Sequence, residues 1–412
     1  MARTGQFSPA AGERLADLLG VCALTWALPS ALVDGAVEAA GRTEQRCRAL
    51  PARTVLYFTL AMWLHPSYGY GEVMRLLSAG LARKHRWAPP LPVPSTAAIA
   101  KARQRLGPDP LRLLFEQVAG PTAGPGAVGA FHRQWRLMSL DAAVLDVQES
   151  PGNRAAYGGP GAGPGPAPGS GRRDGSGGRA LPQVKVLALA ESATHAVCAA
   201  ALGARGPGGA DLVREVLTAL QPGQLVVADH GALSYDLWTR ARGRGAELLW
   251  RARPGLDLPV LRVLDDGSYL SRLAGPAAGD GSVVVRVVEC PLPAAADRSG
   301  RAPGGQIGRL LCSILEPAGA GAAELARLYG ERWRLDTLID ELGARPGRAR
   351  PVLRSKSPAM VEQEVWAMFL AHHAIRPLLA GGTGPAGASA DPVGARARAA
   401  GTPAGPTRER AR

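Results

Sequence analysis

Apolar positions in the first 120 residues recur at the spacing of α-helices, with charged and polar side chains between them. Ser-Pro near the start and Ser95 farther along are typical of helix N-termini, where a hydroxyl can accept a backbone N–H. The predicted helices begin near Ser8 and cover Ala52–Leu64, Tyr70–Arg83, a segment from Ser95, and Pro110–Val118. We therefore predict an all-helical N-terminal domain over residues 1–125.

The helix that begins at Ser95 has the sequence STAAIAKARQRLG. We expect Ile99 and Leu106 to face inward, while Lys101, Arg103 and Arg105 point outward. Such a basic face can lie in a DNA groove or along phosphates. It can equally be the solvated face of a packing helix, and the sequence leaves both interpretations open.

After a Gly/Pro linker at 120–129, the pattern changes to β-strands with helices between them. Strands are expected over Trp135–Val147, Gln183–Leu189, His195–Leu202, Gln224–Asp229 and Glu247–Arg251, and helices over Gly209–Leu220 and Leu233–Arg242. The order β-β-β-α-β-α-β is typical of an α/β mixed sheet with helices on its faces. We assign residues 131–254 and 317–380 to this domain.

The remaining segments differ from that sheet. Residues 255–316 are β-rich and predict an insertion, and a long helix follows from Ala322 to Leu342. A last helix should cover Met360–Ile375 and stop at Pro377, since proline lacks the N–H that a helix needs. Residues 150–180 and 381–412, dominated by small residues and proline, predict a flexible loop and a disordered tail.

Net charge and cysteine usage narrow the class of protein. The formal charge is +14, which favours a polyanionic partner such as DNA or RNA. Because 44 of the 48 basic residues are arginine, a GC-rich genome can account for part of this charge. The five cysteines are scattered without a Cys-x-x-Cys pair, which fits a reducing cytoplasm. The longest mostly apolar run, Val55 to Leu64, is too short to span a bilayer, so we expect no membrane partner.

Three acidic residues are candidates for metal chemistry. Asp141 lies in a predicted strand, Asp229 ends another, and Asp336 lies on the predicted long helix. Carboxylates at strand ends beside a helix can converge on Mg²⁺, which prefers oxygen ligands. Their separations of 88 and 107 residues do not by themselves distinguish them from other acids.

Short motifs around these acids resemble those of insertion-sequence-four type transposases. Asp141-Ala-Ala-Val-Leu-Asp-Val resembles the "DGT-x-LDV" strand, and Asp229-His-Gly-Ala-Leu-Ser-Tyr-Asp-Leu-Trp is similar to "DRGF-x-SYELW". Tyr329-Gly-Glu-Arg332-Trp-Arg-Leu-Asp336 is similar to the Tyr-x2-Arg-x3-Glu-x6-Lys signature. The resemblance covers roughly residues 7–380, and the ordered set is more specific than any single motif.

This resemblance implies a ribonuclease-H-like fold and cut-and-paste DNA transposition, with a helical domain for the element's terminal inverted repeats. It implies Asp141, Asp229 and Asp336 as catalytic ligands of two Mg²⁺ ions, for which Mn²⁺ can substitute. Tyr329 and Arg332 would contact DNA near the scissile phosphate. We expect double-stranded DNA, both terminal repeats and target, as the partner of a homodimer in the bacterial cytoplasm, at the nucleoid.

Four positions depart from the family's pattern. The third acid is Asp336 instead of Glu, and Gly343 stands where the signature has Lys. His230 replaces an Arg, and Ala142-Ala143 replace Gly-Thr. These changes leave two alternatives open: a catalytically decayed relative that only binds DNA, and a metal-dependent nuclease.

Four other polar side chains have a structural or surface role as their simpler interpretation. Asp340 could lean toward the metal, because it shares a helix face with Asp336, although a solvated acidic face is the simpler interpretation. Glu341 is rotated away from the face of Asp336, and we expect it too to belong to a solvated acidic face. His372 and His373 are expected to be packing or surface groups and not ligands.

Overall fold

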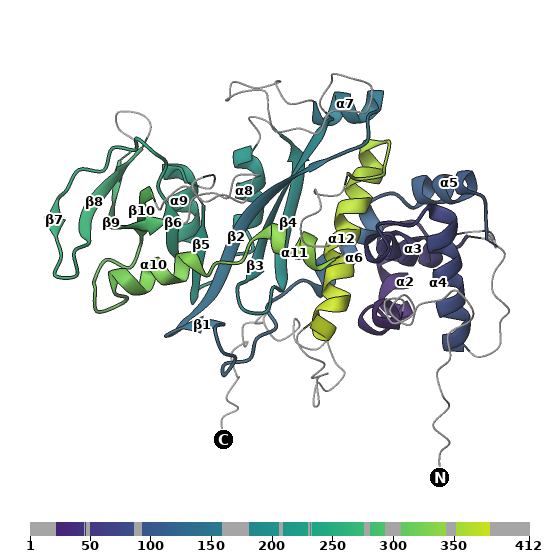
Figure 1. The fold of residues 1–412 in the computed structure, drawn as a ribbon, viewed down its shortest axis with the longest axis horizontal. Coiled ribbons are helices and arrows are strands. Elements are labelled where there is room, and N and C mark those ends of the chain that lie inside the picture. Colours follow the sequence, from purple (N-terminus) through teal and green to yellow (C-terminus); the bar gives the residue numbers. More distant parts are fainter. Residues whose placement is uncertain are drawn as a thin grey trace, which may run out of the picture. The chain divides into compact units, whose positions relative to one another are not determined.

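The computed structural model describes residues 22–44, 46, 50–85, 93–158, 181–205, 209–229, 231, 233–275, 281–292, 306–342 and 352–379 (Figure 1). The described residues up to Arg376 form one compact unit. The helix predicted near Ser8, the predicted tail at 381–412, and residues 159–180 of the predicted loop lie outside the described residues. The predicted domain boundaries stay predictions.

The N-terminal part of the described chain is helical, as predicted. Its helices are α2 (Ser30–Ala39), α3 (Ala52–Leu64), α4 (Tyr70–His85), α5 (Thr96–Leu106) and α6 (Asp109–Val118). Ser95 caps α5, because its hydroxyl accepts the N–H of Ala98 at 3.2 Å. Residues 55–63 of α3 are all buried, so this helix lies inside the helical layer instead of along its surface.

A ten-stranded sheet follows in the described chain. Its strands are β1 (Phe131–His132), β2 (Trp135–Asp146), β3 (Gln183–Glu191), β4 (Val197–Ala204), β5 (Gln224–Ala228), β6 (Glu247–Arg251), β7 (Arg262–Val263), β8 (Tyr269–Ala274), β9 (Ser282–Leu292) and β10 (Gln306–Cys312). The spatial order is β4-β3-β2-β5-β6-β10-β9-β8-β7, with β1 paired to β2. The strands β2, β5 and β6 are parallel, whereas the other pairs are antiparallel. The predicted β-rich insertion therefore continues the same sheet, through the pairing of β10 with β6.

Helices cover both faces of this sheet (Figure 1). On one face, apolar side chains of β2, β3, β5 and β6 pack against α8 (Gly209–Leu217) and α9 (Tyr235–Gly243). On the other face, β5, β6, β9 and β10 pack against α10 (Ala322–Gly330). The rest of that face, on β2 and β3, shares one core with α2–α6, α11 (Leu335–Glu341) and α12 (Pro358–Leu379). The helical N-terminal part is thus joined to the sheet by a common core.

Three helical predictions need correction. The helix predicted from Ala322 to Leu342 is two helices, α10 and α11, separated by an extended link at 331–334. Gly330, a poor helix former, ends the first. Pro377 does not stop the last helix, since α12 continues to Leu379 with the proline in its final turn. Within the predicted loop at 150–180, residues Pro151–Tyr157 form α7.

Candidate active site

The register of the parallel strands brings two of the predicted acids together. Leu140 of β2 pairs with Ala228 of β5, so that the next residues along each strand, Asp141 and Asp229, are neighbours at one level. Ala228 pairs in turn with Trp250 of β6, which places Arg251 beside Asp229. Because β5 and β6 end here, three charged residues meet at the carboxyl edge of the parallel strands, the usual location of ligand sites in α/β sheets.

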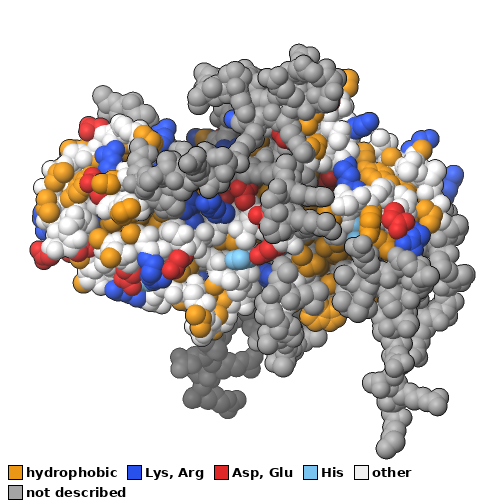
Figure 2. Space-filling view, viewed as in Figure 1, with side chains coloured by type: hydrophobic (Ala, Val, Ile, Leu, Met, Phe, Trp, Pro, Cys, Tyr) orange, Lys and Arg blue, Asp and Glu red, His pale blue; other side chains and the backbone are white. Residues whose placement is uncertain are grey.

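Asp141 and Asp229 line one pocket of about 190 Å³. It is lined by Leu140, Asp141, Ala142, Lys185, Leu187, Val213, Asp229 and Gly231. Lys185 is the one cationic side chain among these lining residues, and burial lowers its pKa. Acidic and basic side chains also adjoin near the middle of the molecular face shown in Figure 2.

The link between α10 and α11 is held against β2 by side-chain hydrogen bonds. The Ser139 hydroxyl accepts the N–H of Trp333 at 3.1 Å, and Asp141 Oδ2 accepts the N–H of Leu335 at 2.8 Å. Ser139 and Asp141 point to the same face of β2, as residues two apart in a strand do. These two bonds divert the backbone from helical geometry, which explains the break in the predicted long helix.

This link sets the position of the third acid. Asp336 lies in the first turn of α11, directly after the bond to Asp141. The two carboxylates are near enough to interact electrostatically, and burial, followed by the charge of Asp336, raises the pKa of Asp141. Backbone hydrogen bonds from Leu335 and Ala142 and the charge of Arg332 act in the opposite direction. The structure therefore brings Asp141 close to both other predicted acids.

Arg332 lies between the acids and is mostly buried. Its guanidinium is 3.5 Å from Asp229 Oδ2 and 4.1 Å from the centre of the Tyr329 ring. Arg251 approaches Asp229 from the other side, at 3.8 Å from Oδ1. Two cations thus partly neutralise Asp229, as ion pairs near a protein surface do.

Tyr329 is fully buried, and burial raises its pKa to about 12. Its ring supports the guanidinium of Arg332 by a cation–π contact. Tyr329 therefore exposes no surface that could make the predicted direct contact with DNA. Its contact with Arg332 indicates instead that Tyr329 positions that guanidinium.

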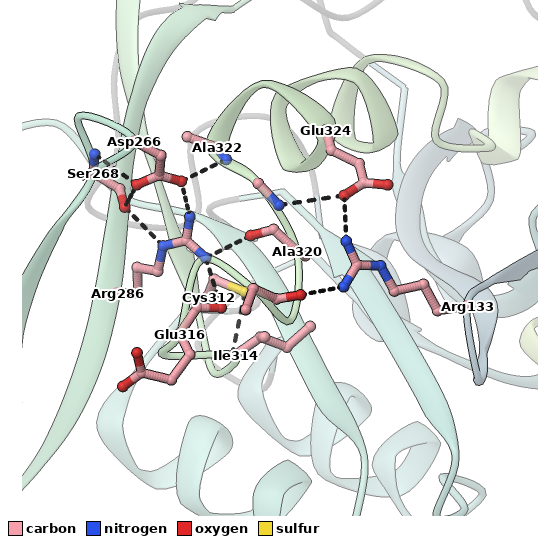
Figure 3. A network of polar contacts seen from close by, with 12 residues as sticks. Arg133, Asp266, Ser268, Arg286, Cys312, Ile314, Glu316, Ala320, Ala322 and Glu324 are labelled. Carbon is pink, nitrogen blue, oxygen red and sulfur yellow. Dashed lines mark hydrogen bonds and ion pairs between the residues drawn. The ribbon is translucent and has the colours of Figure 1, made fainter. Parts of the chain in front are cut away.

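A buried ion pair fixes α10 to the β-rich segment (Figure 3). Arg286 of β9 is fully buried, pairs with Asp266, and donates to Ser268 at 2.8 Å and to the Ala320 carbonyl at 2.6 Å. Asp266 also accepts the N–H of Ala322, the first residue of α10. Since α10 carries Tyr329, the β-rich segment helps to set the position of the site.

Glu341 at the end of α11 has a different role from the one expected. It accepts hydrogen bonds from His195 at 2.9 Å and from His372 at 2.7 Å. Burial acts to raise the pKa of Glu341, but these two histidines lower it to about 2. His372 is buried, as a packing group would be, yet it also anchors α11 through Glu341, while Asp340 is exposed.

The three predicted DNA-binding residues of α5 do not share one environment. Lys101 and Arg105 are exposed, as predicted, whereas Arg103 is fully buried, and its predicted outward orientation is wrong. Arg103 is four residues after Ile99 and three before Leu106, which places it on the apolar stripe of the helix. Its guanidinium donates to Gln363, Tyr70 and Ser355 and so joins α5 to α4 and α12.

The three candidate acids offer the type of ligand atom that a hard divalent cation binds. Asp141, Asp229 and Asp336 offer carboxylate oxygens, which Mg²⁺ prefers. Across the described parts of the chain, no three His, Cys, Asp or Glu side chains are already gathered closely enough to hold a metal ion. His230 and Gly343, two of the departures from the family's pattern, lie outside the described residues.

Comparisons with known proteins relate the chain to transposases. The family described as "Insertion element 4 transposase N-terminal" matches residues 19–116. "Transposase InsG for insertion sequence element IS4" of Escherichia coli (strain K12) is 26% identical over 361 residues, 84% of this chain and 73% of that protein. The chain is a relative of the insertion-sequence-four transposases. This result confirms the predicted family.

A solved transposase is also similar, although more weakly. The cryo-EM structure of the piggyBac transposase synaptic complex with hairpin DNA has a TM-score of 0.43 and 10% identity, covering 89% of this chain and 76% of that one. Within the described residues of this relative of the insertion-sequence-four transposases, none of the helices combines the length and the apolar composition that a membrane-spanning helix needs.

Sequence reasoning missed three residues of the site in this transposase relative. Arg251 ends a short strand that is parallel to β5, a signal that could have placed it beside Asp229. Ser139 precedes Asp141 by two residues and shares its face of the strand. No pattern in the sequence could have placed Lys185 in the site, because its position depends on the pairing of β3 with β2 and on the packing of α8.

Proposed function

We propose that the chain is a DNA transposase whose metal-binding carboxylates are Asp141, Asp229 and Asp336. It would hydrolyse phosphodiester bonds at the ends of its element and join the freed 3′ hydroxyls to target DNA. The observation that carries this proposal is the alignment of Asp141 and Asp229, 88 residues apart in sequence, in one pocket at one level of adjacent parallel strands. The relationship to the insertion-sequence-four transposases supports it.

The order of the strands supports the predicted ribonuclease-H-like fold. The first long strand, β2, lies between the β3–β4 hairpin and the parallel pair β5–β6. Asp141 and Asp229 therefore lie on parallel neighbours at the centre of the sheet, and α11 brings Asp336 alongside. The remaining sheet, β7 to β10, would then be the β insertion that the resemblance implies.

Two divalent ions, Mg²⁺ or Mn²⁺, would supply the activation of water or of a 3′ hydroxyl and the stabilisation of the leaving oxygen. The protein's own cations have a separate task. Arg332 is held by the Tyr329 ring beside Asp229, and a guanidinium can bind a phosphate through two parallel hydrogen bonds. In this proposal Arg332, which lies beside Asp229, would bind the scissile phosphate.

The helical region would bind the terminal repeats. Residues 19–116 match the N-terminal family, and α5 exposes Lys101 and Arg105 toward solvent. Exposed cations of this kind contact phosphates and position a protein on DNA. Strand transfer requires two element ends at once, which favours a homodimer on DNA. The cytoplasmic, nucleoid-associated location stays a prediction.

Cleavage of a terminal-repeat duplex tests the proposal. The repeats can be found as inverted sequences that flank the gene, and cleavage should require Mg²⁺ or Mn²⁺. We expect Asp141→Asn and Asp229→Asn to abolish cleavage while binding of the duplex remains. An Asp141→Asn variant that still cuts would show that the site is elsewhere.

A decayed relative that only binds DNA is the second candidate. Asp336 is one methylene shorter than the family's Glu, and Asp229 is already paired with Arg332 and Arg251. If wild type binds the duplex but does not cut it, the double variant Asp336→Glu with Gly343→Lys decides. Cleavage by this variant supports decay, and silence of both proteins contradicts the proposed chemistry.

A further inference from the structure

The pocket beside Asp141 contains a lysine that the proposed chemistry has not used. Lys185 lies on β3, where it pairs with Val144 of β2, and it points to the same face as Leu187, two residues on. Both residues line the pocket that Asp141 and Asp229 share. Lys185 is therefore fixed to the central sheet and not to a loop.

The surroundings of Lys185 are unfavourable for a charged ammonium group without a bound counter-ion. The side chain is half-buried, and within the described part of the chain its ammonium group makes no hydrogen bond or ion pair. A Cβ on Gly209 would lie 2.9 Å from Lys185 Nζ, so the ammonium group lies against the first residue of α8. The N-terminus of a helix carries partial positive charge, which adds a second cost to the ammonium.

A buried or half-buried charge without a partner destabilises a fold, because it loses hydration and gains no counter-charge. A bound anion would offset this cost, since it would contact both the ammonium and the positive end of α8. The pocket opens beside the two carboxylates proposed to hold metal, so a phosphate bound there would be next to the reacting centre.

We propose that Lys185 binds a phosphate oxygen of the DNA strand that enters this pocket, and so supplies the cation that the signature position, Gly343, lacks. The inference rests on the proposed function, because it takes DNA as the occupant of the pocket. Lys185 comes from the β2–β3 pairing, not from α11. The phosphate would therefore be held from the opposite side to Arg332.

The sequence makes this proposal easy to test, because it contains only four lysines: Lys84, Lys101, Lys185 and Lys356. Reductive ¹³C-methylation of the full chain should give four side-chain NMR signals, assigned by single Lys→Arg variants. The probe is a tetrathymidylate single strand, first without and then with Mg²⁺. We expect the Lys185 signal to shift, while that of exposed Lys356 stays unchanged.

Lys185→Met is the functional variant, and Lys356→Met is its matched control. Methionine keeps the apolar stem of the lysine, so Lys185→Met should be at least as stable in urea as wild type, since an unpaired half-buried charge is removed. It should weaken tetrathymidylate binding roughly tenfold, the usual effect of one charge-assisted contact. A purely structural lysine would give the opposite pattern, with lower stability and unchanged affinity.

The two proposals fail in different ways. If wild type never cuts DNA, but the Lys185 signal shifts and Lys185→Met binds the strand more weakly, the transposase chemistry fails and the phosphate site stands. If wild type cuts DNA, while Lys185→Met cuts and binds like Lys356→Met and the Lys185 signal does not move, the phosphate site is refuted and the proposed function stands.

Discussion

Replacing Arg103 by methionine separates a structural role of α5 from a DNA-binding role. The guanidinium is fully buried and donates to Gln363 at 2.8 Å, to Tyr70 at 2.6 Å and to Ser355 at 3.1 Å. It also reaches the carbonyl of Met360 at 3.3 Å. Methionine fills most of the space but donates no hydrogen bond, so the Gln363 oxygen loses its partner, whereas the Met360 carbonyl keeps its place in the hydrogen-bond ladder of α12.

A buried polar group left unpaired costs about 1–3 kcal/mol, so the unpaired Gln363 oxygen predicts a loss of that size. That is a large part of the stability of an ordinary domain, about 5–15 kcal/mol. Urea unfolding followed by circular dichroism measures the loss, with Lys101→Met and Arg105→Met as exposed controls on the same helix.

The controls should show the reverse behaviour. Lys101→Met and Arg105→Met should unfold at close to the wild-type urea concentration, because both side chains are exposed. Each should reduce the slope of log K for duplex binding against log salt concentration by about one. The reasoning is refuted if Arg103→Met unfolds like wild type and weakens DNA binding as the controls do.

Three further substitutions test the site and its supports. Burial raises the pKa of Asp141 above its value in the unfolded chain, so the ionised carboxylate destabilises the fold as pH rises. Asp141→Asn should therefore raise the thermal midpoint at pH 7. An unchanged or lower midpoint would contradict this reasoning. The pKa of Glu341 is lowered to about 2, so its contribution to the stability of the fold should be present above about pH 4.5 and lost toward pH 2. Glu341→Gln should remove this loss of stability in acid, which thermal midpoints measured across that pH range will show. Arg286→Met leaves Asp266 without its buried partner and should cost about 3–5 kcal/mol in urea unfolding, part of which Asp266→Asn should recover; equal stability of wild type and Arg286→Met argues against the ion pair as a support of α10.

Local patterns were enough to predict most of the elements of the chain. The apolar spacing in α3 and α6, the serine cap of α5 and the strands that contain Asp141 and Asp229 were all found from neighbouring residues. Such features depend on helix period, strand alternation and capping, which are properties of short segments.

Errors occurred where a distant residue decides the local conformation. The break after α10 depends on Ser139 and Asp141, about 190 residues earlier, whose side chains accept the N–H groups of Trp333 and Leu335. Arg103 is buried because Gln363 and Ser355, which are 260 and 252 residues later in the sequence, accept hydrogen bonds from its guanidinium. Charge alone predicts exposure, and only these partners reverse it.

The sequence by itself determined the lineage and the identity of the candidate acids, because short motifs in a fixed order contain that information. Only the tertiary structure placed Asp141 beside Asp229, paired Arg251 and Arg332 with that acid, and put Lys185 in the same pocket. The physical reason is that strand register and helix packing join residues far apart in sequence. The chemistry of a site depends on those distances and on burial, which no local pattern contains.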